Sequence, residues 1–285
     1  MPDYPFAPNY IEGLDGFETL RMHYLDEGSK MANTTFLCLH GQPSWSFLYR
    51  KMIPVFAGAG YRVIAPDLFG FGKSDKPVDD DVYTYHFHRD ALMAFIRALD
   101  LQNVTLVCQD WGGILGLTLV PEMRERFTRL IVMNTAIPTG ISAGKGFEDW
   151  KAYNRSQPDL NVAGLFKRSH PRLSEAEAAA YAAPFPDVSY KAGVRRFPEL
   201  VMVEPDMEGV NEAKAAVKFW QEDWAGESFM AIGMQDPVLG PPIMYQLRNL
   251  IKGCPEPMIV ENGGHFVQEC GTDIAKAALT HFGLG

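Results

Sequence analysis

An aspartate between an apolar run and a pair of glycines is the first residue of this sequence that could do chemistry. Residues 104–109 read as a short buried strand, Asp110 and Trp111 follow, and Gly112-Gly113 opens a helical stretch. A sharp strand-to-helix turn exposes a nucleophile at the edge of a sheet, and small residues let the helix approach closely. A carboxylate there faces the positive end of the helix dipole, which keeps it ionised. Aspartate also commonly caps helices, so this segment alone leaves a catalytic and a structural role open.

A histidine and a second aspartate lie in equivalent places further along the chain. His265 follows two glycines on a loop after the predicted strand 258–261, and Asp236 follows the predicted strand 228–233. A histidine of this kind can act as a general base, and a neighbouring carboxylate can orient its ring. The order nucleophile, acid, histidine is the order found in α/β hydrolases. We therefore predict that Asp110, Asp236 and His265 form a catalytic triad.

The segments around these residues alternate between strand and helix. Continuous apolar runs, typical of strands buried on both faces, occur at 35–39, 61–66, 104–109, 130–133, 228–233 and 258–261. Helical patterns are found at 45–57, 84–99, 112–124, 242–251 and 266–282. This alternation predicts an α/β fold with a mostly parallel central sheet flanked by helices. A strand pair that includes residues 17–25 is expected before the first buried strand.

The chain between residues 137 and 205 interrupts this alternation. It is helix-prone and punctuated by prolines, and Ser174 followed by Glu177 has the spacing of a capping box. We expect residues 1–136 and 206–285 to form the main domain and residues 137–205 to form a helical cap inserted into it. An insert after a sheet strand lies over the strand ends where α/β sheets bind ligands. The insert is therefore predicted to be a lid over the site.

Five segments carry a family resemblance. They are His40-Gly41-Gln42-Pro43, Asp67-Leu68-Phe69-Gly70-Phe71-Gly72-Lys73-Ser74-Asp75, Gln109-Asp110-Trp111-Gly112-Gly113, Gly146-Phe147-Glu148-Asp149-Trp150 and Gly264-His265-Phe266-Val267-Gln268-Glu269. Through them the sequence resembles the haloalkane dehalogenases, from about Asp15 to the last predicted helix. Asp110-Trp111 together with Trp150 is similar to the subfamily that holds halide between two indoles and takes its acid after the later strand. Asn134, where other subfamilies place that carboxylate, is neutral.

The resemblance implies an α/β-hydrolase fold and hydrolysis of haloalkanes to a primary alcohol, halide and a proton. A carbon that bears a halogen has no carbonyl group, so it must be attacked by in-line displacement. A carboxylate can do this without a base and forms an alkyl ester. The resemblance therefore assigns Asp110 as the nucleophile, His265 as the general base that activates water against the ester, and Asp236 as the acid that orients His265.

The resemblance also assigns the groups that bind the leaving group and the substrate. Indole N–H donors of Trp111 and Trp150 would hold the halide in an otherwise apolar site. Backbone N–H groups of Gln42 and Trp111 would form the oxyanion hole, and the Gln42 side chain could add a contact to halide or water. The expected pocket walls are Phe147, Val238 and Leu239. An ordinary role in the hydrophobic core is the alternative for each of these three residues.

Two other functions stay open at this point. An epoxide hydrolase shares the aspartate–histidine–aspartate apparatus but activates the epoxide oxygen with cap tyrosines, and the insert contains Tyr153, Tyr181 and Tyr190. The tryptophan pair favours halide over an epoxide. A non-catalytic ligand-binding α/β hydrolase is the second alternative, and the intact triad counts against it. No metal and no organic cofactor is implied.

Composition limits the partners and the location. The chain has 26 Lys and Arg and 35 Asp and Glu, a net charge of −9, so no basic face is expected for nucleic acid or anionic lipid. No apolar stretch reaches the roughly 18 residues of a membrane-spanning helix, and no basic residue precedes Arg21, unlike a secretory signal. The scattered cysteines favour reduced thiols. We expect a cytoplasmic monomer whose partners are a haloalkane substrate and the halide ion.

Overall fold

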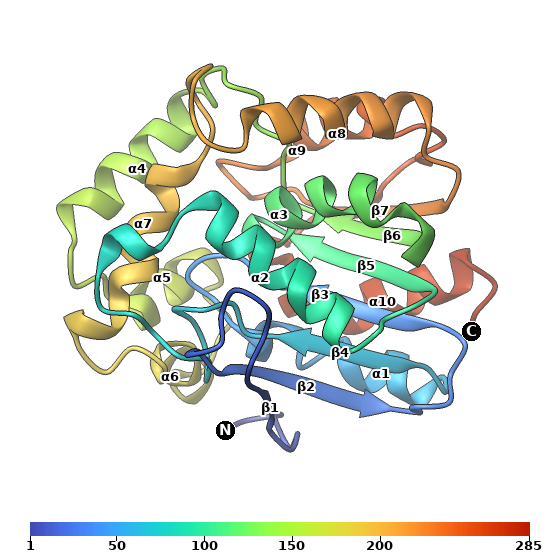
Figure 1. Ribbon diagram of the computed structural model, residues 1–285, viewed down its shortest axis with the longest axis horizontal. Helices are drawn as coiled ribbons and strands as arrows, with labels where there is room; N and C mark the ends of the chain where they lie inside the picture. Colours follow the sequence, from blue (N-terminus) through green and yellow to red (C-terminus); the bar gives the residue numbers. More distant parts are fainter.

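The computed structural model describes residues 1–285 and is built around one eight-stranded sheet (Figure 1). The strands are β1 (Asn9–Ile11), β2 (Met22–Gly28), β3 (Thr35–Leu39), β4 (Arg62–Pro66), β5 (Val104–Gln109), β6 (Phe127–Met133), β7 (Glu227–Gly233) and β8 (Met258–Val260). Their spatial order is β1-β2-β4-β3-β5-β6-β7-β8. The first two strands are antiparallel to their neighbours, and β3 to β8 all pair in parallel. The mostly parallel sheet predicted from the sequence is confirmed.

The central strands are buried along their whole length. Every residue of β3 and β5 is buried, because helices cover both faces of a parallel sheet. On one face α1 (Ile53–Gly58) packs against α10 (Gly271–His281). On the other face lie α2 (Tyr85–Ala98), α3 (Trp111–Leu119) and α8 (Val210–Glu222), with α9 (Pro241–Leu250) beside α8. The carboxyl ends of the parallel strands all point toward one side of the molecule (Figure 1).

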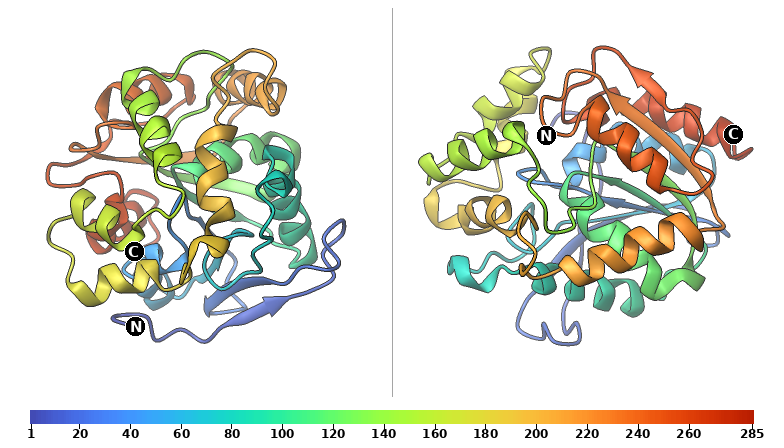
Figure 2. Two further views of the ribbon diagram at one scale, coloured as in Figure 1. Left: turned by 90° about the vertical axis from the view of Figure 1, so that its left-hand side faces the viewer. Right: turned by 90° about the horizontal axis from the view of Figure 1, so that it is seen from above.

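Four further helices lie beyond these strand ends (Figure 2). They are α4 (Lys145–Ser156), α5 (Val162–Ser169), α6 (Glu175–Ala182) and α7 (Ala192–Leu200). The predicted capping box is present at the start of α6, where the side chains of Ser174 and Glu177 each accept from the other's backbone N–H. We propose that residues 137–205 are the cap. One hydrophobic core of 79 buried residues runs through both parts, so the cap is packed onto the main domain.

Some predicted element boundaries are wrong, and proline explains two of them. The helix predicted at 45–57 is a 3₁₀ turn, Ser46–Tyr49, followed by α1, which has a proline in its first turn. The helix predicted at 112–124 ends at Leu119, and it is followed by a 3₁₀ segment, Val120–Arg126, whose second residue is a proline. Proline lacks an N–H donor and clashes with the preceding turn, so a helix begins or ends near it.

The two ends of the chain also differ in detail from the sequence prediction. The expected strand pair is formed by β1 and β2, but β2 begins at Met22 rather than at residue 17. Leu14 and Phe17 form an isolated bridge that lengthens the turn before it. The last helix begins at Gly271, after a 3₁₀ turn, Val267–Cys270.

All four cysteines are unpaired. The structure contains no helix that is both long and apolar enough to span a membrane.

Candidate active site

Asp110 occupies a strained turn between β5 and α3. Its φ and ψ angles are 49° and −127°, a region that residues other than glycine rarely adopt. Two residues that follow β6 hold the turn: Asp110 N donates to Asn134 O at 3.0 Å, and Thr135 Oγ1 donates to Asp110 O at 2.7 Å. Glycine is required at position 112, because a Cβ there would lie 2.0 Å from the carbonyl oxygen of Leu39 in β3. The predicted strand–turn–helix geometry is therefore present.

The loop after β3 closes over the Asp110 carboxylate. The backbone N–H of Gln42 donates to Asp110 Oδ2 at 2.8 Å, and Gly41 approaches so closely that a Cβ would lie 2.3 Å from the same oxygen. Burial raises the pKa of Asp110, although His265 and the backbone N–H groups of Gln42 and Trp111 oppose that rise. The Gln42 side chain donates to the Val194 carbonyl of α7 at 2.9 Å, so it ties this loop to the cap.

His265 and Asp236 meet at the same edge of the sheet as Asp110. His265 Nδ1 lies 2.9 Å from Asp236 Oδ2, and His265 Nε2 lies 3.8 Å from Asp110 Oδ1. Asp236 Oδ1 accepts from the backbone N–H groups of Val238 and Leu239 at 2.9 and 3.0 Å. Burial alone would raise the pKa of Asp236, but His265 and these N–H groups lower it below its usual value. Asp236 is therefore ionised beside the ring.

Two opposing effects set the pKa of His265. Burial alone would lower the pKa of His265, but Asp236 and then Asp110 outweigh burial and raise it to about 9. The distance of 3.8 Å to Asp110 is too long for a hydrogen bond, so that carboxylate acts on the ring through charge alone.

Two amide side chains that sequence reasoning did not place in the site also touch the triad. Asn134 Nδ2 donates to Asp236 Oδ2 at 3.0 Å. Gln109 Nε2 donates to the His265 carbonyl at 3.0 Å and lies 3.1 Å from His265 Nε2. Gln109 is a fully buried amide at the end of an otherwise mostly apolar strand. Because a buried amide needs partners, that placement was a signal that could have identified it.

A cavity of about 580 Å³ opens between the triad and the cap. It is lined by all three triad residues and by Trp111, Trp150 and Gln42. The predicted pocket walls Phe147, Val238 and Leu239 also line it. The rest of the lining is largely apolar and includes Ile114, Ile137, Val201 and Leu247. The sequence therefore identified residues that the fold brings together from five separate segments.

The tryptophans form two groups, according to whether the indole N–H donates to another atom of the protein. Three of them donate within the protein: Trp45 to Ala180 O at 3.2 Å, Trp220 to Leu117 O at 2.8 Å and Trp224 to Ser228 Oγ at 3.0 Å. The indole N–H groups of Trp111 and Trp150 donate to no protein atom, and both residues line the cavity. These two donors are thus available to a ligand.

The cap tyrosines do not face the nucleophile. Tyr181 is fully buried and its hydroxyl is bonded to Glu269 and Arg50. Tyr153 and Tyr190 are 38% and 43% exposed, and none of the three tyrosines lines the cavity. The arrangement therefore lacks the hydroxyl donors that an epoxide hydrolase of this fold uses. No group of three or more His, Cys, Asp or Glu residues is arranged to hold a metal ion.

Comparison with known proteins agrees with this geometry. Residues 34–272 match the family model of the α/β hydrolase fold, which places the chain in that class of proteins. The chain is 45% identical to a haloalkane dehalogenase of Psychrobacter cryohalolentis over 284 residues, covering 97% of this chain and 92% of the relative. It is 39% identical to a haloalkane dehalogenase of Mycobacterium marinum, covering 97% and 94%. The chain belongs to the haloalkane dehalogenase family.

A solved structure supports the same relationship. The tetrameric structure of haloalkane dehalogenase DpaA from Paraglaciecola agarilytica NO2 superposes with a TM-score of 0.97 at 53% sequence identity. The match covers 98% of this chain and 94% of that one. The cap and the main domain therefore have the same relative arrangement in the two chains.

Proposed function

We propose that this protein hydrolyses the carbon–halogen bond of small haloalkanes to a primary alcohol, halide and a proton. One observation carries the proposal: a carboxylate on a strand-to-helix turn, a histidine–aspartate pair and two tryptophans whose indole N–H groups donate to no protein atom all line one largely apolar cavity. Attack by a carboxylate explains why the turn presents Asp110 rather than serine. Two N–H donors without protein partners can hold a large anion in a largely apolar cavity.

In the first half-reaction Asp110 displaces the halide. Oδ2 is held by the Gln42 N–H, so Oδ1 is the free oxygen and attacks the carbon. A carbon–oxygen bond forms while the carbon–halogen bond breaks, and the halide leaves with the bonding electron pair. Trp111 and Trp150 donate to the halide as its charge develops. The product is a neutral alkyl ester on Asp110.

In the second half-reaction His265 removes a proton from water through Nε2. The water oxygen attacks Cγ of Asp110, and the carbonyl oxygen becomes an oxyanion that accepts from the N–H groups of Gln42 and Trp111. Asp236 stabilises the imidazolium. Collapse breaks the bond between Cγ and the alkoxy oxygen, the alcohol leaves with a proton, and the carboxylate is restored with loss of the second proton.

A single turnover in heavy-oxygen water tests this route. We expect the label to enter the peptide that contains Asp110, because water attacks the ester carbonyl and not the alkyl carbon. Label in the alcohol alone would mean direct attack by water and would refute the covalent route. Release of diol from an epoxide, with no halide from bromoalkanes, would favour the epoxide hydrolase. No turnover of either class by the folded protein would favour a binding protein.

A histidine variant tests whether His265 acts only in the second half-reaction. His265→Gln removes the base that the second half-reaction needs and leaves the nucleophile intact. We expect release of about one halide per site, followed by accumulation of alkylated protein that mass spectrometry detects. A folded variant without this first release would show that His265 also serves the displacement.

We propose that the chain acts as a monomer with the haloalkane and the halide as its partners. The similar Paraglaciecola agarilytica protein is described as tetrameric. Light scattering on the eluted protein decides between these states. A particle of 31.8 kDa is expected for the monomer, and a mass about four times larger would contradict it.

A further inference from the structure

The cap contacts the segment that carries His265 on both sides of the histidine. Ser169, at the end of α5, lies so close to Gly264 that a Cβ there would be 2.7 Å from its carbonyl oxygen. Phe266 stacks on Phe166 of α5, with ring centroids 3.9 Å apart and planes inclined by 21°. These contacts immediately precede and follow the histidine. The backbone at His265 is thus held between main domain and cap.

An aromatic column continues these contacts into α6. Phe166 stacks on Tyr181 with centroids 3.6 Å apart and planes inclined by 10°, so its ring lies between Tyr181 and Phe266. The rings of His265 and Phe266 are inclined by 81°, with centroids 4.8 Å apart. Neither Phe166 nor Tyr181 lines the substrate cavity. Their contact with the site therefore passes through Phe266, which lines the cavity beside His265.

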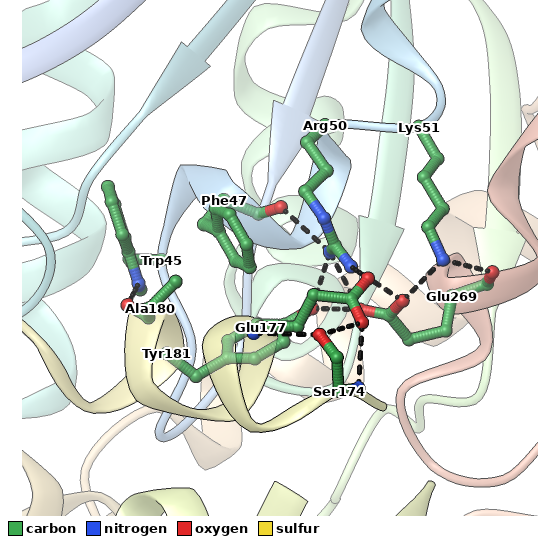
Figure 3. A network of polar contacts seen from close by, with 9 residues as sticks. All are labelled: Trp45, Phe47, Arg50, Lys51, Ser174, Glu177, Ala180, Tyr181 and Glu269. Atoms are coloured by element: carbon green, nitrogen blue, oxygen red, sulfur yellow. Dashed lines mark hydrogen bonds and ion pairs between the residues drawn. The ribbon is translucent and has the colours of Figure 1, made fainter. Parts of the chain in front are cut away.

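A buried ion cluster closes the column at its far end (Figure 3). The Tyr181 hydroxyl donates to Glu269, four residues after the histidine. Arg50 donates to both carboxylate oxygens of Glu269 at 2.7 and 2.8 Å, and to Glu177 of α6 at 2.9 Å. Lys51 Nζ adds a bond to Glu269 at 2.8 Å. Two positive and two negative groups thus compensate one another at the junction of α6 and the turn Val267–Cys270.

The main domain holds the histidine in a different way. Asp236 and Gln109 contact the ring nitrogens themselves, at 2.9 Å from Nδ1 and 3.1 Å from Nε2. The cap instead holds the chain before and after the ring, at residues 264, 266 and 269. A catalytic group displaced by about 1 Å can lose roughly a hundredfold in rate. The distance from His265 Nε2 to the ester carbon depends on both sets of contacts.

We infer that α5 and α6 act as a clamp that positions His265 for the attack of water on the ester. In this clamp Phe166, Tyr181 and Glu269 are positioning residues, and none of them touches the reacting atoms. Asp110 is held by β3, β5, β6 and α3 and receives none of these contacts. Loosening the clamp therefore slows hydrolysis of the ester and leaves the displacement of halide unchanged. The inference rests on the proposed function.

Quenched-flow kinetics of two variants test the clamp. Phe166→Leu removes the middle ring of the column, and Tyr181→Phe keeps the column but removes the hydroxyl bonded to Glu269. We expect the rate of the first halide release to stay within about twofold of the unmodified protein. Decay of the alkylated protein should slow roughly tenfold or more in Phe166→Leu, in line with a displaced base, and less in Tyr181→Phe. Tyr181→Phe also keeps the test decisive if Phe166→Leu fails to fold.

Phe185→Leu is the matched control. Phe185 is a buried cap residue that packs on Phe71 of the main domain, with centroids 6.1 Å apart, and it makes no aromatic contact with the histidine segment. We expect it to lower the melting temperature while the ratio of the two half-reaction rates stays unchanged. Equal slowing of both half-reactions in the clamp variants would overturn the inference, as would variants that match the Phe185→Leu ratio. Absence of any halide release by the folded, unmodified protein would instead contradict the proposed function.

An NMR measurement on the free protein distinguishes failure of the clamp inference from failure of the proposed function. The ring resonances of His265 report its position beside Phe266 in the free protein. We expect Phe166→Leu to shift or broaden them and Phe185→Leu to leave them in place. Unchanged His265 resonances in Phe166→Leu would show that the cap does not position the ring, whatever reaction the protein catalyses.

Discussion

The charge on Asp110 is expected to control the pKa of His265, and Asp110→Asn isolates that effect. The substitution keeps the shape of the side chain and removes only its charge. It thereby imitates the electrostatic state of the ester, in which the same carboxyl group is neutral. Gln42 N–H can still donate to the amide oxygen of the new side chain. The pKa of His265 in this variant therefore approximates its pKa in the covalent intermediate.

The size of the expected fall in the pKa of His265 follows from one distance. His265 Nε2 and Asp110 Oδ1 are 3.8 Å apart, for which Coulomb's law gives about 4 kcal/mol at an effective dielectric constant of about 20 and about 1 kcal/mol at that of water. At about 1.4 kcal/mol per pKa unit, these limits correspond to a fall of about three units and about one unit. Both side chains are partly open to the cavity, with 19% and 14% exposure, which favours the lower half of this range. We expect the pKa of His265 to fall from about 9 to between about 7 and 8.

Titration of the histidine resonances by NMR measures this fall directly. His265→Gln identifies the signal, because it is the one that disappears. Asp223→Asn, an exposed change at the end of α8, is the control and should leave the pKa of His265 where it was. A pKa in Asp110→Asn equal to that of the unmodified protein would refute the reasoning. It would mean that formation of the ester does not release His265 as a base, and that the two half-reactions are not linked by charge.

The remaining predictions concern the halide site and the turn. Trp150→Phe keeps most of the ring and removes one donor, so the displacement should slow roughly a hundredfold, since such a donor is worth about 2.7–4 kcal/mol in comparable sites. Saturable quenching of tryptophan fluorescence by bromide should weaken in the same variant and persist in Trp224→Phe, and an unchanged bromide titration would remove Trp150 from the site. Gly112→Ala places a Cβ 2.0 Å from the Leu39 carbonyl, so thermal unfolding should show a loss of about 1–3 kcal/mol. An unchanged melting temperature would show that α3 can shift away from β3.

The triad was predictable because each member follows a strand that the sequence marks clearly. Apolar runs precede Asp110, Asp236 and His265, and parallel strands bring their carboxyl ends to one edge. Their meeting in space therefore follows from strand order and direction, which the alternation of elements already implies. The shortened helices were harder to predict, because periodicity continues across a proline that ends the backbone pattern.

The contacts that surround the triad were not predictable in the same way. Arg50 and Glu269 are 219 residues apart in sequence, and Tyr181 and Glu269 are 88 apart. No local pattern links such pairs, because their meeting depends on how the cap docks and on which rotamers the packed rings adopt. Gln109 and Asn134 are intermediate cases. Burial of an amide at a strand end indicates that it has partners, but which atoms it bonds depends on the neighbouring loops.

In the mechanism that we propose, the cap acts on the two half-reactions through different helices. Trp150 on α4 offers a donor to the cavity where halide leaves, whereas Phe166 on α5 and Tyr181 on α6 hold the chain around His265. Because these contacts are separate, a change in α4 can alter the choice of halide without moving the base. A change at Phe166 or Tyr181, neither of which lines the cavity, can alter the lifetime of the ester without altering halide affinity. A cap divided in this way lets the displacement and the hydrolysis be tuned independently, although both use the same carboxylate.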